Sequence, residues 1–403
     1  MYLHRTIEKV TPRLSQGFDV VMLSSMRQAG KRTALKRMCE PSRTCVTLDD
    51  PAALDLATNA PRDFFEQYAP PVLIDRAERA PGLFRAIAAD PRPGKGGIWL
   101  SGPRKLELVK DVGDSPAGRI LELQMMPMSL YERNGRGLDQ HPYLPDFSAC
   151  GFSEPRAPEA VWETILQGGW PEALHLNARE RRQFFSAFLM NFLEQDIARL
   201  WNIGKLDAFR RFMQALALRT GQELRIGELA ALAGIDPATA KRWLSVAEAS
   251  GLVYLLKPLA GNGTRVLTKS PRVYMTDTGL AAFLSRKTTV VELRSDMNAG
   301  AFFETFVVTE ILKSWLHNGL EPDFHFLRDQ KSGGEIDLII HHEGTWYPME
   351  IKSTISPNSE MAKHFVQIDR LGLRRGTGAV ICSTPNRKRF LSEDIITHSV
   401  WEI

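Results

Sequence analysis

The stretch "SMRQAGKRT", residues 25–33, has most of the spacing of a loop that binds the phosphates of a nucleotide. The Walker A form of this loop is G-x-x-x-x-G-K-[ST]: its glycines let backbone N–H groups point at the phosphates, its lysine offsets their charge, and its hydroxyl ligates Mg²⁺. Gly30 and Lys31 match, whereas Ser25 stands at the first glycine and Arg32 at the hydroxyl. Thr33 is turned about 100° around a helix from the hydroxyl position. The sequence therefore predicts a nucleotide-binding loop with a changed metal position.

The segment "PPVLIDRAE", residues 70–78, predicts the strand whose last residue would complete a magnesium site. In P-loop enzymes an aspartate at this place holds the metal, and Asp75 stands there. An acid that orients the attacking water is expected next, but the residue is Arg76. Losing a general base costs about 10²–10⁴ in rate, or roughly 3–5.5 kcal/mol. Two interpretations stay open: weak hydrolysis, or a scaffold in which Arg32 pairs with Asp75 in place of a metal.

A second group of chemically capable residues lies in "GEIDLIIHHEGTWYPMEIKST", residues 334–354. Asp337, Glu350 and Lys352 have the spacing of the PD-(D/E)XK nuclease core. Carboxylates at adjacent strand ends can hold Mg²⁺ or Mn²⁺, and a nearby lysine can activate a water. Glu304, on the preceding predicted helix, matches the first acid of this core, and Gln367 follows on a later helix. We expect this acid–lysine set to be catalytic, with Asp337 and Glu350 as metal ligands. The alternative is a fold of this type that binds without cleaving.

Residues 205–285 predict a winged helix-turn-helix. One helix ends at Gly234, and the next begins at Asp236 and Pro237, an N-cap and a first-turn residue that favour a helix start. "GLVYLLKPL" and "PRVYMTD" are typical of two paired strands. The alternative to a DNA-binding surface is a solvated cationic face. The cations that could contact DNA phosphates and base edges are Arg225, Lys241 and Arg242.

The elements around the phosphate loop predict a parallel sheet covered by helices on both faces. Short apolar runs alternate with helical stretches: "FDVVMLS", "TCVTLDD", "PPVLIDRAE", "GGIWLSGPRKLEL" and "RILELQMMPMSL". Phosphate loops and their acidic partners lie at the carboxyl ends of such strands. The expected fold class is α/β in four parts: a P-loop nucleotide-binding domain over 1–132, a linker and helical lid over 133–204, the winged helix over 205–285, and a nuclease-like domain over 286–403.

The composition is that of an ordinary globular protein. Of 403 residues, 43% are hydrophobic and 24% are charged, with a net charge of +4, which permits a nucleic-acid partner without requiring one. The four cysteines show no zinc spacing. No apolar run approaches the roughly 20 residues of a membrane-spanning helix, and the first residues are not those of a signal peptide. We therefore expect a cytoplasmic protein without a membrane partner.

The motifs together resemble a family of bacterial and archaeal AAA-like P-loop ATPases that carry a C-terminal domain of unknown function. The resemblance covers nearly the whole chain. It rests on "RTIEKVTPRLSQGFDVVMLSSMRQAGKRTALKRM", "VTLDDP", "PPVLIDRAERAPGLF", "WLSGPRKLELVKDVGDSPAGRILELQMMPMSLYE", "LQGGWPEAL", "FLEQDIARL" and "KSPRVYMTDTGL".

This resemblance implies a set of residues that contact a nucleotide. Ser101 matches a polar residue that senses the γ-phosphate, and Arg119 matches an arginine that could meet a phosphate. The sequence departs from the family pattern at Ser25, Arg32 and Arg76, which puts hydrolysis in doubt more than the fold. The remaining expected contacts are Arg27, Gly30, Lys31 and Asp75, with Ser25, Arg32 and Thr33 beside them.

The sequence thus predicts an ATP-binding AAA-like protein, weak or inactive in hydrolysis, whose nucleotide state gates a DNA-directed, nuclease-like C-terminal domain. This prediction rests on a difference between the two sites. The ATPase motifs are altered at Ser25, Arg32 and Arg76, whereas the acid–lysine set of the C-terminal region is complete. Two alternatives stay open, a non-catalytic interaction or signalling scaffold, and a working ATPase in which Thr33 and a distant acid replace the missing groups. The expected cofactors are ATP and, at the C-terminal carboxylates, Mg²⁺ or Mn²⁺. Assembly into an oligomer also stays open.

Overall fold

The computed structural model describes residues 2–89, 94–102, 120–145, 156–198, 203–259, 270–329, 333–384 and 389–403. The chain divides into two compact units. The first comprises Met1–His141, Ala249–Gly251 and Trp315–Leu320, and the second comprises Pro142–Glu248, Leu252–Ser314 and Glu321–Ile403. The finer four-part division stays a prediction.

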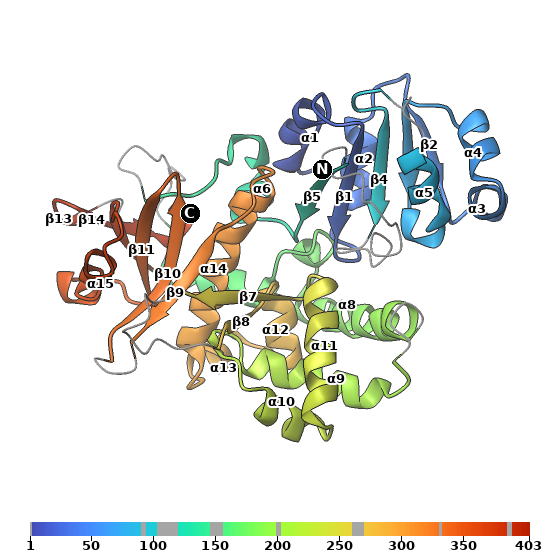
Figure 1. Cartoon of the computed structure of the whole chain (residues 1–403). Coiled ribbons are helices and arrows are strands. Elements are labelled where there is room, and N and C mark those ends of the chain that lie inside the picture. The colour runs from blue at the N-terminus through green and yellow to red at the C-terminus, as the bar shows by residue number, and fades with distance from the viewer. Residues whose placement is uncertain are drawn as a thin grey trace. The chain divides into compact units, whose positions relative to one another are not determined.

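The first unit is built on a five-stranded sheet with the order β2-β3-β4-β1-β5 (Figure 1). Every neighbouring pair is parallel, so the predicted N-terminal parallel sheet is confirmed. The strands are β1 (Val20–Ser25), β2 (Thr44–Thr47), β3 (Val72–Asp75), β4 (Ile98–Gly102) and β5 (Ile120–Met125).

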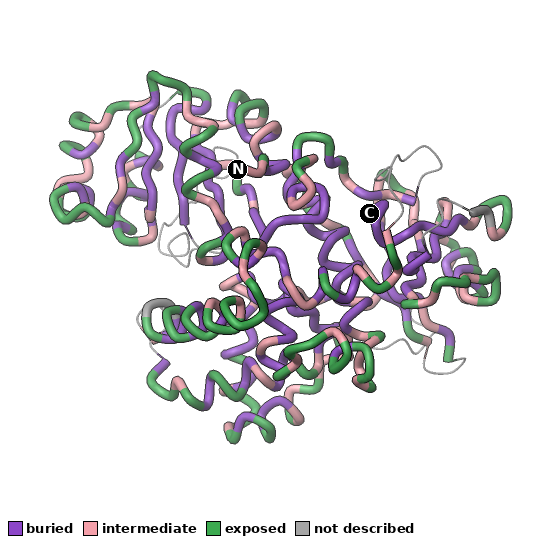
Figure 2. The backbone as a smooth tube through the Cα atoms, turned by 180° about the vertical axis from the view of Figure 1, so that it is seen from behind, coloured by how far each residue is buried: buried purple, intermediate pink, exposed green. Residues whose placement is uncertain are grey.

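Helices cover both faces of this sheet, because successive strand residues point to opposite sides. Val20 and Met22 of β1 belong to one buried cluster, which includes residues of α3 (Pro51–Asn59), α4 (Pro61–Gln67) and α5 (Gly82–Ala89). Val21 and Leu23 belong to the other, with residues of α1 (Ile7–Ser15) and α2 (Lys31–Met38). The three central strands β1, β3 and β4 are accordingly buried along their whole length, whereas the edge strands β2 and β5 are only partly buried (Figure 2).

The carboxyl ends of three strands meet at one edge of this sheet. β4 pairs with β1 and with β3, so Ser24 lies opposite Gly102 and Ile74 lies opposite Leu100. The loop from β1 to α2 starts at this edge and ends at Gly30, which has φ 92°. Glycine reaches this left-handed backbone conformation without the steric cost that other residues bear. The fold therefore brings the phosphate loop and the end of β3 to the same edge.

A buried carboxylate, Glu132 of α6 (Leu130–Arg133), joins three segments of the first unit. It accepts hydrogen bonds from the backbone N–H groups of Thr6 at 2.8 Å and Ser129 at 2.9 Å. Arg5 Nε lies 3.0 Å from Oε2, and His317 Nδ1 lies 3.1 Å from Oε1. Burial by itself raises the pKa of Glu132, but Arg5 and His317 outweigh burial and hold this pKa well below its usual range. The carboxylate is thus a charged structural centre of this unit.

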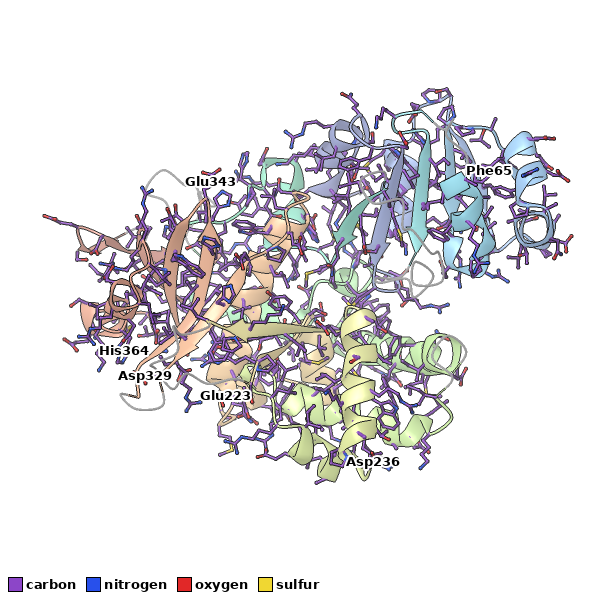
Figure 3. The ribbon with its side chains drawn as sticks, in the orientation of Figure 1. Phe65, Glu223, Asp236, Asp329, Glu343 and His364 are labelled. Atoms are coloured by element: carbon purple, nitrogen blue, oxygen red, sulfur yellow. The ribbon has the colours of Figure 1, made fainter. Side chains whose placement is uncertain are left out.

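The second unit contains a nine-stranded sheet with the order β13-β14-β12-β11-β10-β9-β7-β8-β6. β7 and β8 are antiparallel, as the sequence predicts for this pair, and β7 also pairs parallel with β9. Glu223 of β6 accepts a hydrogen bond from Arg328 Nη1 of β9 at 2.8 Å (Figure 3 labels Glu223). The strands are β6 (Gln222–Glu223), β7 (Val253–Pro258), β8 (Arg272–Met275), β9 (Phe324–Arg328), β10 (Glu335–His342), β11 (Thr345–Lys352), β12 (Gly378–Cys382), β13 (Arg389–Ser392) and β14 (Ile395–Ser399).

Helices of the second unit include the pair predicted around Gly234. This glycine has φ 70° and ends the first helix of the pair. No helix in the described part of the chain is long and apolar enough to cross a membrane. The helices are α7 (Ala160–Gln167), α8 (Ala178–Asn191), α9 (Leu206–Leu218), α10 (Ile226–Ala233), α11 (Pro237–Ala249), α12 (Thr278–Leu284), α13 (Val290–Arg294), α14 (Ala299–Leu316) and α15 (Val366–Arg370).

Replacing Glu132 by glutamine should destabilise the protein by about 3–5 kcal/mol, because Arg5 and His317 would lose a buried counter-charge. Glu180 is a matched control, since it forms the same type of capping box on α8 but is exposed. Glu180→Gln should change the free energy of unfolding by only about 0.5 kcal/mol. Urea unfolding followed by circular dichroism measures both, and similar values for the two variants would contradict the structural role of Glu132.

Candidate functional site

The phosphate loop places Lys31 at the carboxyl edge of the first sheet. α2 begins at Lys31, directly after Gly30, and the Lys31 ammonium donates a hydrogen bond to the carbonyl oxygen of Gly102 at 2.6 Å. Ser25 is buried at the end of β1, where its hydroxyl donates to the carbonyl of Met26 at 2.9 Å. The lysine of the predicted loop thus lies across the end of β4.

Asp75 is the polar centre of this edge. Ser101 donates a hydrogen bond of 2.5 Å to Asp75 Oδ1, and Thr47 donates one of 3.4 Å to Oδ2. Arg32 Nε lies 3.5 Å from the same Oδ2. Side-chain oxygens from β2 and β4 therefore bind Asp75, and a guanidinium group lies where a P-loop enzyme would hold a metal. These residues do not fit a magnesium ion on Asp75.

Arg76 points into a group of acids. Its Nε lies 3.3 Å from Asp49 Oδ1 and 3.5 Å from Glu78 Oε1, and its backbone N–H donates to Ser101 Oγ at 3.2 Å. The residue after Asp75 is thus a cation, Arg76, that is paired with two carboxylates.

The structure brings together Lys31, Arg32, Asp75 and Ser101 from the predicted nucleotide set. Thr33 is exposed on α2, whereas Arg27 is half-buried in the loop. Arg119 lies outside the described residues. Sequence reasoning missed Thr47 and Glu78, although both stand close to strand ends that it identified, in "VTLDDP" and "IDRAE".

The predicted C-terminal residues also come together, in the second unit. Lys352 Nζ lies 3.2 Å from Asp337 Oδ2 and 2.5 Å from Glu350 Oε1. The backbone N–H of Ile351 donates to the same Asp337 oxygen at 3.0 Å. β10 and β11 are antiparallel neighbours, and this pairing places the three side chains at one point of the sheet.

A buried arginine from β8 completes this cluster. Arg272 Nη1 lies 3.0 Å from Glu304 Oε1 and 3.5 Å from Asp337 Oδ1, and the guanidinium also pairs with Glu335. The Tyr274 hydroxyl donates to Glu304 Oε1 at 2.6 Å. Sequence reasoning missed Arg272 and Tyr274, because no local pattern in "PRVYM" indicates that this strand meets α14 and β10. The cluster is therefore an acid group that two cations, Arg272 and Lys352, already neutralise in part.

Burial and mutual repulsion shift the carboxyl groups of this cluster. Burial, and then the charge of Asp337, raise the pKa of Glu304 to about 7 and that of Glu350 to about 8. Burial alone would lower the pKa of Lys352, but Asp337 and Glu350 outweigh it and raise this pKa above its usual value. Near neutral pH the cluster thus holds carboxyl groups that resist ionisation.

The expected metal on Asp337 and Glu350 is not supported. In the parts of the chain that the structure describes, no group of three or more His, Cys, Asp or Glu side chains is arranged to hold a metal ion. Lys352 contacts both of the expected ligands. Gln367 is buried on α15. The residues do not fit a divalent ion in this arrangement.

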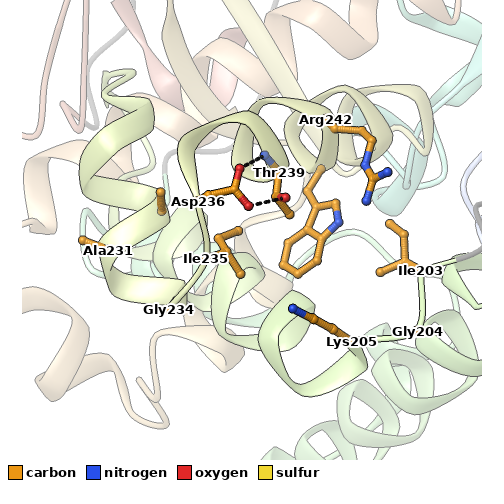
Figure 4. A pocket seen from close by; sticks show the side chains of 11 residues that line it. Ile203, Gly204, Lys205, Ala231, Gly234, Ile235, Asp236, Thr239 and Arg242 are labelled. Carbon is orange, nitrogen blue, oxygen red and sulfur yellow. Dashed lines mark hydrogen bonds between the residues drawn. The ribbon is translucent and has the colours of Figure 1, made fainter.

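The helix pair α10 and α11 borders a cavity of about 590 Å³ (Figure 4). Asp236 caps α11 by accepting hydrogen bonds from the N–H of Thr239 at 2.9 Å and from its hydroxyl at 2.6 Å. Lys205 and Arg242 line the cavity beside these groups. The predicted DNA contacts Arg225, Lys241 and Arg242 are all exposed, and Arg225 Nη1 lies 3.0 Å from Glu228 Oε1. The assignment as a winged helix stays a prediction.

Three family models match separate parts of the chain. Residues 18–134 match an AAA domain. Residues 158–290 and 299–402 match two domains of unknown function, DUF8612 and DUF4143. The first match and the parallel sheet support an AAA-like P-loop domain in this part of the chain, and with it nucleotide binding.

Individual proteins similar to this chain include two from mycobacteria. The uncharacterized proteins Mb2031c of Mycobacterium bovis and Rv2008c of Mycobacterium tuberculosis are each 26% identical over 356 residues, covering 87% of this chain and 74% of theirs. Among solved structures, the Walker-type ATPase PABY2304 of Pyrococcus abyssi is 12% identical with a TM-score of 0.45, covering 70% of this chain and 96% of its own.

The raised carboxyl pKa values predict that part of the stability is lost as pH rises. A carboxyl group whose pKa rises from 4.5 to about 8 on folding contributes full stability below the lower value and loses it as pH rises through the upper one. Glu350→Gln removes this titration, so the variant should match the wild type at low pH and melt at a higher temperature than the wild type above pH 8. Circular dichroism melting curves across this pH range measure the effect.

Glu343 provides the control for this experiment, because it is exposed on the turn between β10 and β11 (Figure 3). Glu343→Gln should follow the wild type at every pH. A gap between Glu350→Gln and the wild type that stays constant with pH would contradict the assigned titration.

Proposed function

We propose that this protein binds a nucleoside triphosphate at the loop ending in Gly30 and Lys31, hydrolyses it slowly at most, and uses its nucleotide state to gate a DNA-directed, nuclease-like C-terminal region. The match of residues 18–134 to an AAA domain supports the nucleotide. The left-handed Gly30 and the position of Lys31 at the carboxyl edge of the sheet support the location of its phosphates.

The observation that carries this proposal is the pairing of Arg32 with Asp75 at 3.5 Å. A guanidinium group carries a fixed positive charge and several N–H donors, so it can bind phosphate oxygens. The Arg32 side chain is 53% exposed, so it can turn toward a ligand, while the buried Asp75 keeps its hydrogen bonds from Ser101 and Thr47. Arg32 would then neutralise the phosphates in place of a metal, which favours binding over turnover.

Slow hydrolysis follows from Arg76. A guanidinium group cannot accept a proton from water near neutral pH. The ion pairs of Arg76 with Asp49 and Glu78 hold its guanidinium group in place. The position that should supply a base therefore supplies a cation. Weak turnover is the expected outcome.

DNA as the target of the C-terminal region rests on two features. Lys241 and Arg242 are exposed on α11, the second helix of the predicted helix-turn-helix, where such cations contact phosphates and base edges. The acid–lysine set has the spacing of the PD-(D/E)XK core. The second candidate function is a non-cleaving scaffold, which the ion pairs of Arg272 favour, because they fill the carboxylate cluster from within the chain.

Lys31→Ala tests nucleotide binding. Loss of a charge-assisted hydrogen bond of about 1.5–3 kcal/mol should weaken binding of a fluorescent ATP analogue by about 10- to 100-fold. Lys36→Ala is the matched control, because Lys36 lies exposed on the same helix. Equal affinity of the Lys31→Ala and Lys36→Ala variants for the ATP analogue would contradict a role of Lys31 in nucleotide binding.

The same variants test the gating. Anisotropy of a labelled DNA duplex should change on adding ATP for the wild type and for Lys36→Ala, but not for Lys31→Ala. A wild type whose melting curve ignores both ATP and DNA would support the scaffold instead.

Restoring the missing groups should strengthen the dependence of binding on Mg²⁺. The double variant Arg32→Thr/Arg76→Glu supplies a hydroxyl and a carboxylate where P-loop enzymes carry them, so added Mg²⁺ should tighten ATP binding several-fold more than in the wild type. Arg32→Lys keeps the positive charge and should stay insensitive to Mg²⁺. Titrations of labelled ATP with and without Mg²⁺ measure this, and an unchanged Mg²⁺ effect in the double variant would show that the arginines are bystanders.

A further inference from the structure

Glu78, a carboxylate largely withdrawn from solvent, lies one turn after Asp75 at the edge of the sheet that carries the phosphate loop. It belongs to the short 3₁₀ helix Ala77–Arg79, which directly follows β3 and Arg76. Its side chain is only 13% exposed. An ionisable group withdrawn from water to this extent needs a partner or a role.

The backbone after β3 fixes the position of Glu78. Arg76 has φ 63° and ψ 43°, a left-handed conformation that non-glycine residues rarely adopt. Ala77 is fully buried, and Arg79 Nη1 donates to the carbonyl of Leu48 at 2.7 Å and lies 3.0 Å from Asp49 Oδ1. The residues on both sides of Glu78 are therefore anchored, and Glu78 has little freedom to leave the site.

Positive charges of the nucleotide site act on this carboxylate. Burial raises the pKa of Glu78, and the charge of Lys31 opposes this more strongly than that of Arg76. Arg76 Nε lies 3.5 Å from Oε1. The other oxygen, Oε2, is buried and accepts no hydrogen bond from any described residue. Glu78 thus feels the charge of Lys31, the lysine proposed to bind phosphate, and its Oε2 has no hydrogen-bond donor among the described residues.

Other carboxylates near the loop are less suited to accept a proton. Both oxygens of Asp75 are taken by Ser101, Thr47 and Arg32. Asp49 is half-exposed and pairs with two arginines. Glu78 combines burial with an available oxygen, and burial that raises a pKa also makes the ionised carboxylate a stronger base.

We propose that Glu78 is the general base of this site and supplies the carboxylate that position 76 lacks. This inference rests on the proposed nucleotide binding. The oxygen of a water molecule forms a bond to the γ-phosphorus, and the bond from that phosphorus to the β,γ-bridging oxygen breaks. The bond electrons stay with the diphosphate, and the proton of the water passes to Glu78 and then to bulk solvent. The slow hydrolysis of the nucleotide uses Glu78 as its base.

Glu78→Gln tests the inference, because it keeps the shape of the side chain and removes the base. Phosphate release from ATP should fall at least about tenfold, given that a general base contributes about 10²–10⁴. Affinity for a fluorescent ATP analogue should stay within about twofold, since a base acts on the transition state rather than on ground-state binding. Glu78→Asp should retain part of the rate. Glu66→Gln on α4, an exposed position, should behave as the wild type, and Lys31→Ala sets the background.

The outcomes separate the inference from the proposed function. Retained binding with lost phosphate release in Glu78→Gln supports the base. Equal rates of phosphate release in the wild type and in Glu78→Gln contradict the role of Glu78 as the base. The same holds if the wild type binds ATP but releases no phosphate above the Lys31→Ala background. Neither outcome contradicts nucleotide binding. A wild type that binds no nucleotide overturns the proposed function and this inference with it.

Discussion

Neutralisation of buried carboxylates by arginine is the interaction on which this structure depends. Removing a carboxylate from water costs several kcal/mol unless hydrogen bonds and a counter-charge replace the lost hydration. The chain meets this cost in the same way at three places, with Arg5 on Glu132, Arg32 on Asp75 and Arg272 on Glu304. At Asp75 the arginine lies where P-loop enzymes hold a metal ion. The same solution therefore stabilises the fold and sets the limits of its chemistry.

The edge of the first sheet and the carboxylate cluster of the second unit differ in how firmly the arginine is held. The Arg32 side chain is 53% exposed and 3.5 Å from its partner, and such a pair near water contributes little, so a ligand with more negative charge can replace Asp75 as its partner. Arg272 is 5% exposed and contacts Glu304 of α14 and two acids of β10, Glu335 and Asp337. Removing it would leave buried charge uncompensated, which costs about 3–5 kcal/mol. The edge of the first sheet is thus suited to an exchangeable ligand, whereas the carboxylate cluster is part of the folded core of its unit.

The sequence predicted what depends on local pattern. Apolar runs, glycine at the end of the loop and residue spacing indicated the parallel sheet, and they indicated that Lys31 and Asp75 meet at one edge. They could not indicate the neighbours that long-range pairing brings. Arg272 reaches its acids because β8 pairs with β7 and β7 pairs with β9, and no local signal encodes that order. Glu78 was missed for another reason: its direction depends on the left-handed conformation of Arg76, which propensities do not favour for arginine.

The contacts at the edge of the first sheet also bear on how a bound nucleotide would be sensed. Ser101 donates to Asp75 Oδ1 and accepts from the backbone N–H of Arg76, so Asp75 is connected to the turn that carries Glu78. A phosphate that draws Arg32 away leaves Asp75 with its full negative charge beside two hydroxyl donors. The hydrogen bond from Ser101 then strengthens, because the carboxylate no longer shares its charge with a guanidinium. The first structural response to a ligand would therefore arise in the segment after β3, which holds both Arg76, proposed to slow turnover, and Glu78, proposed as the base.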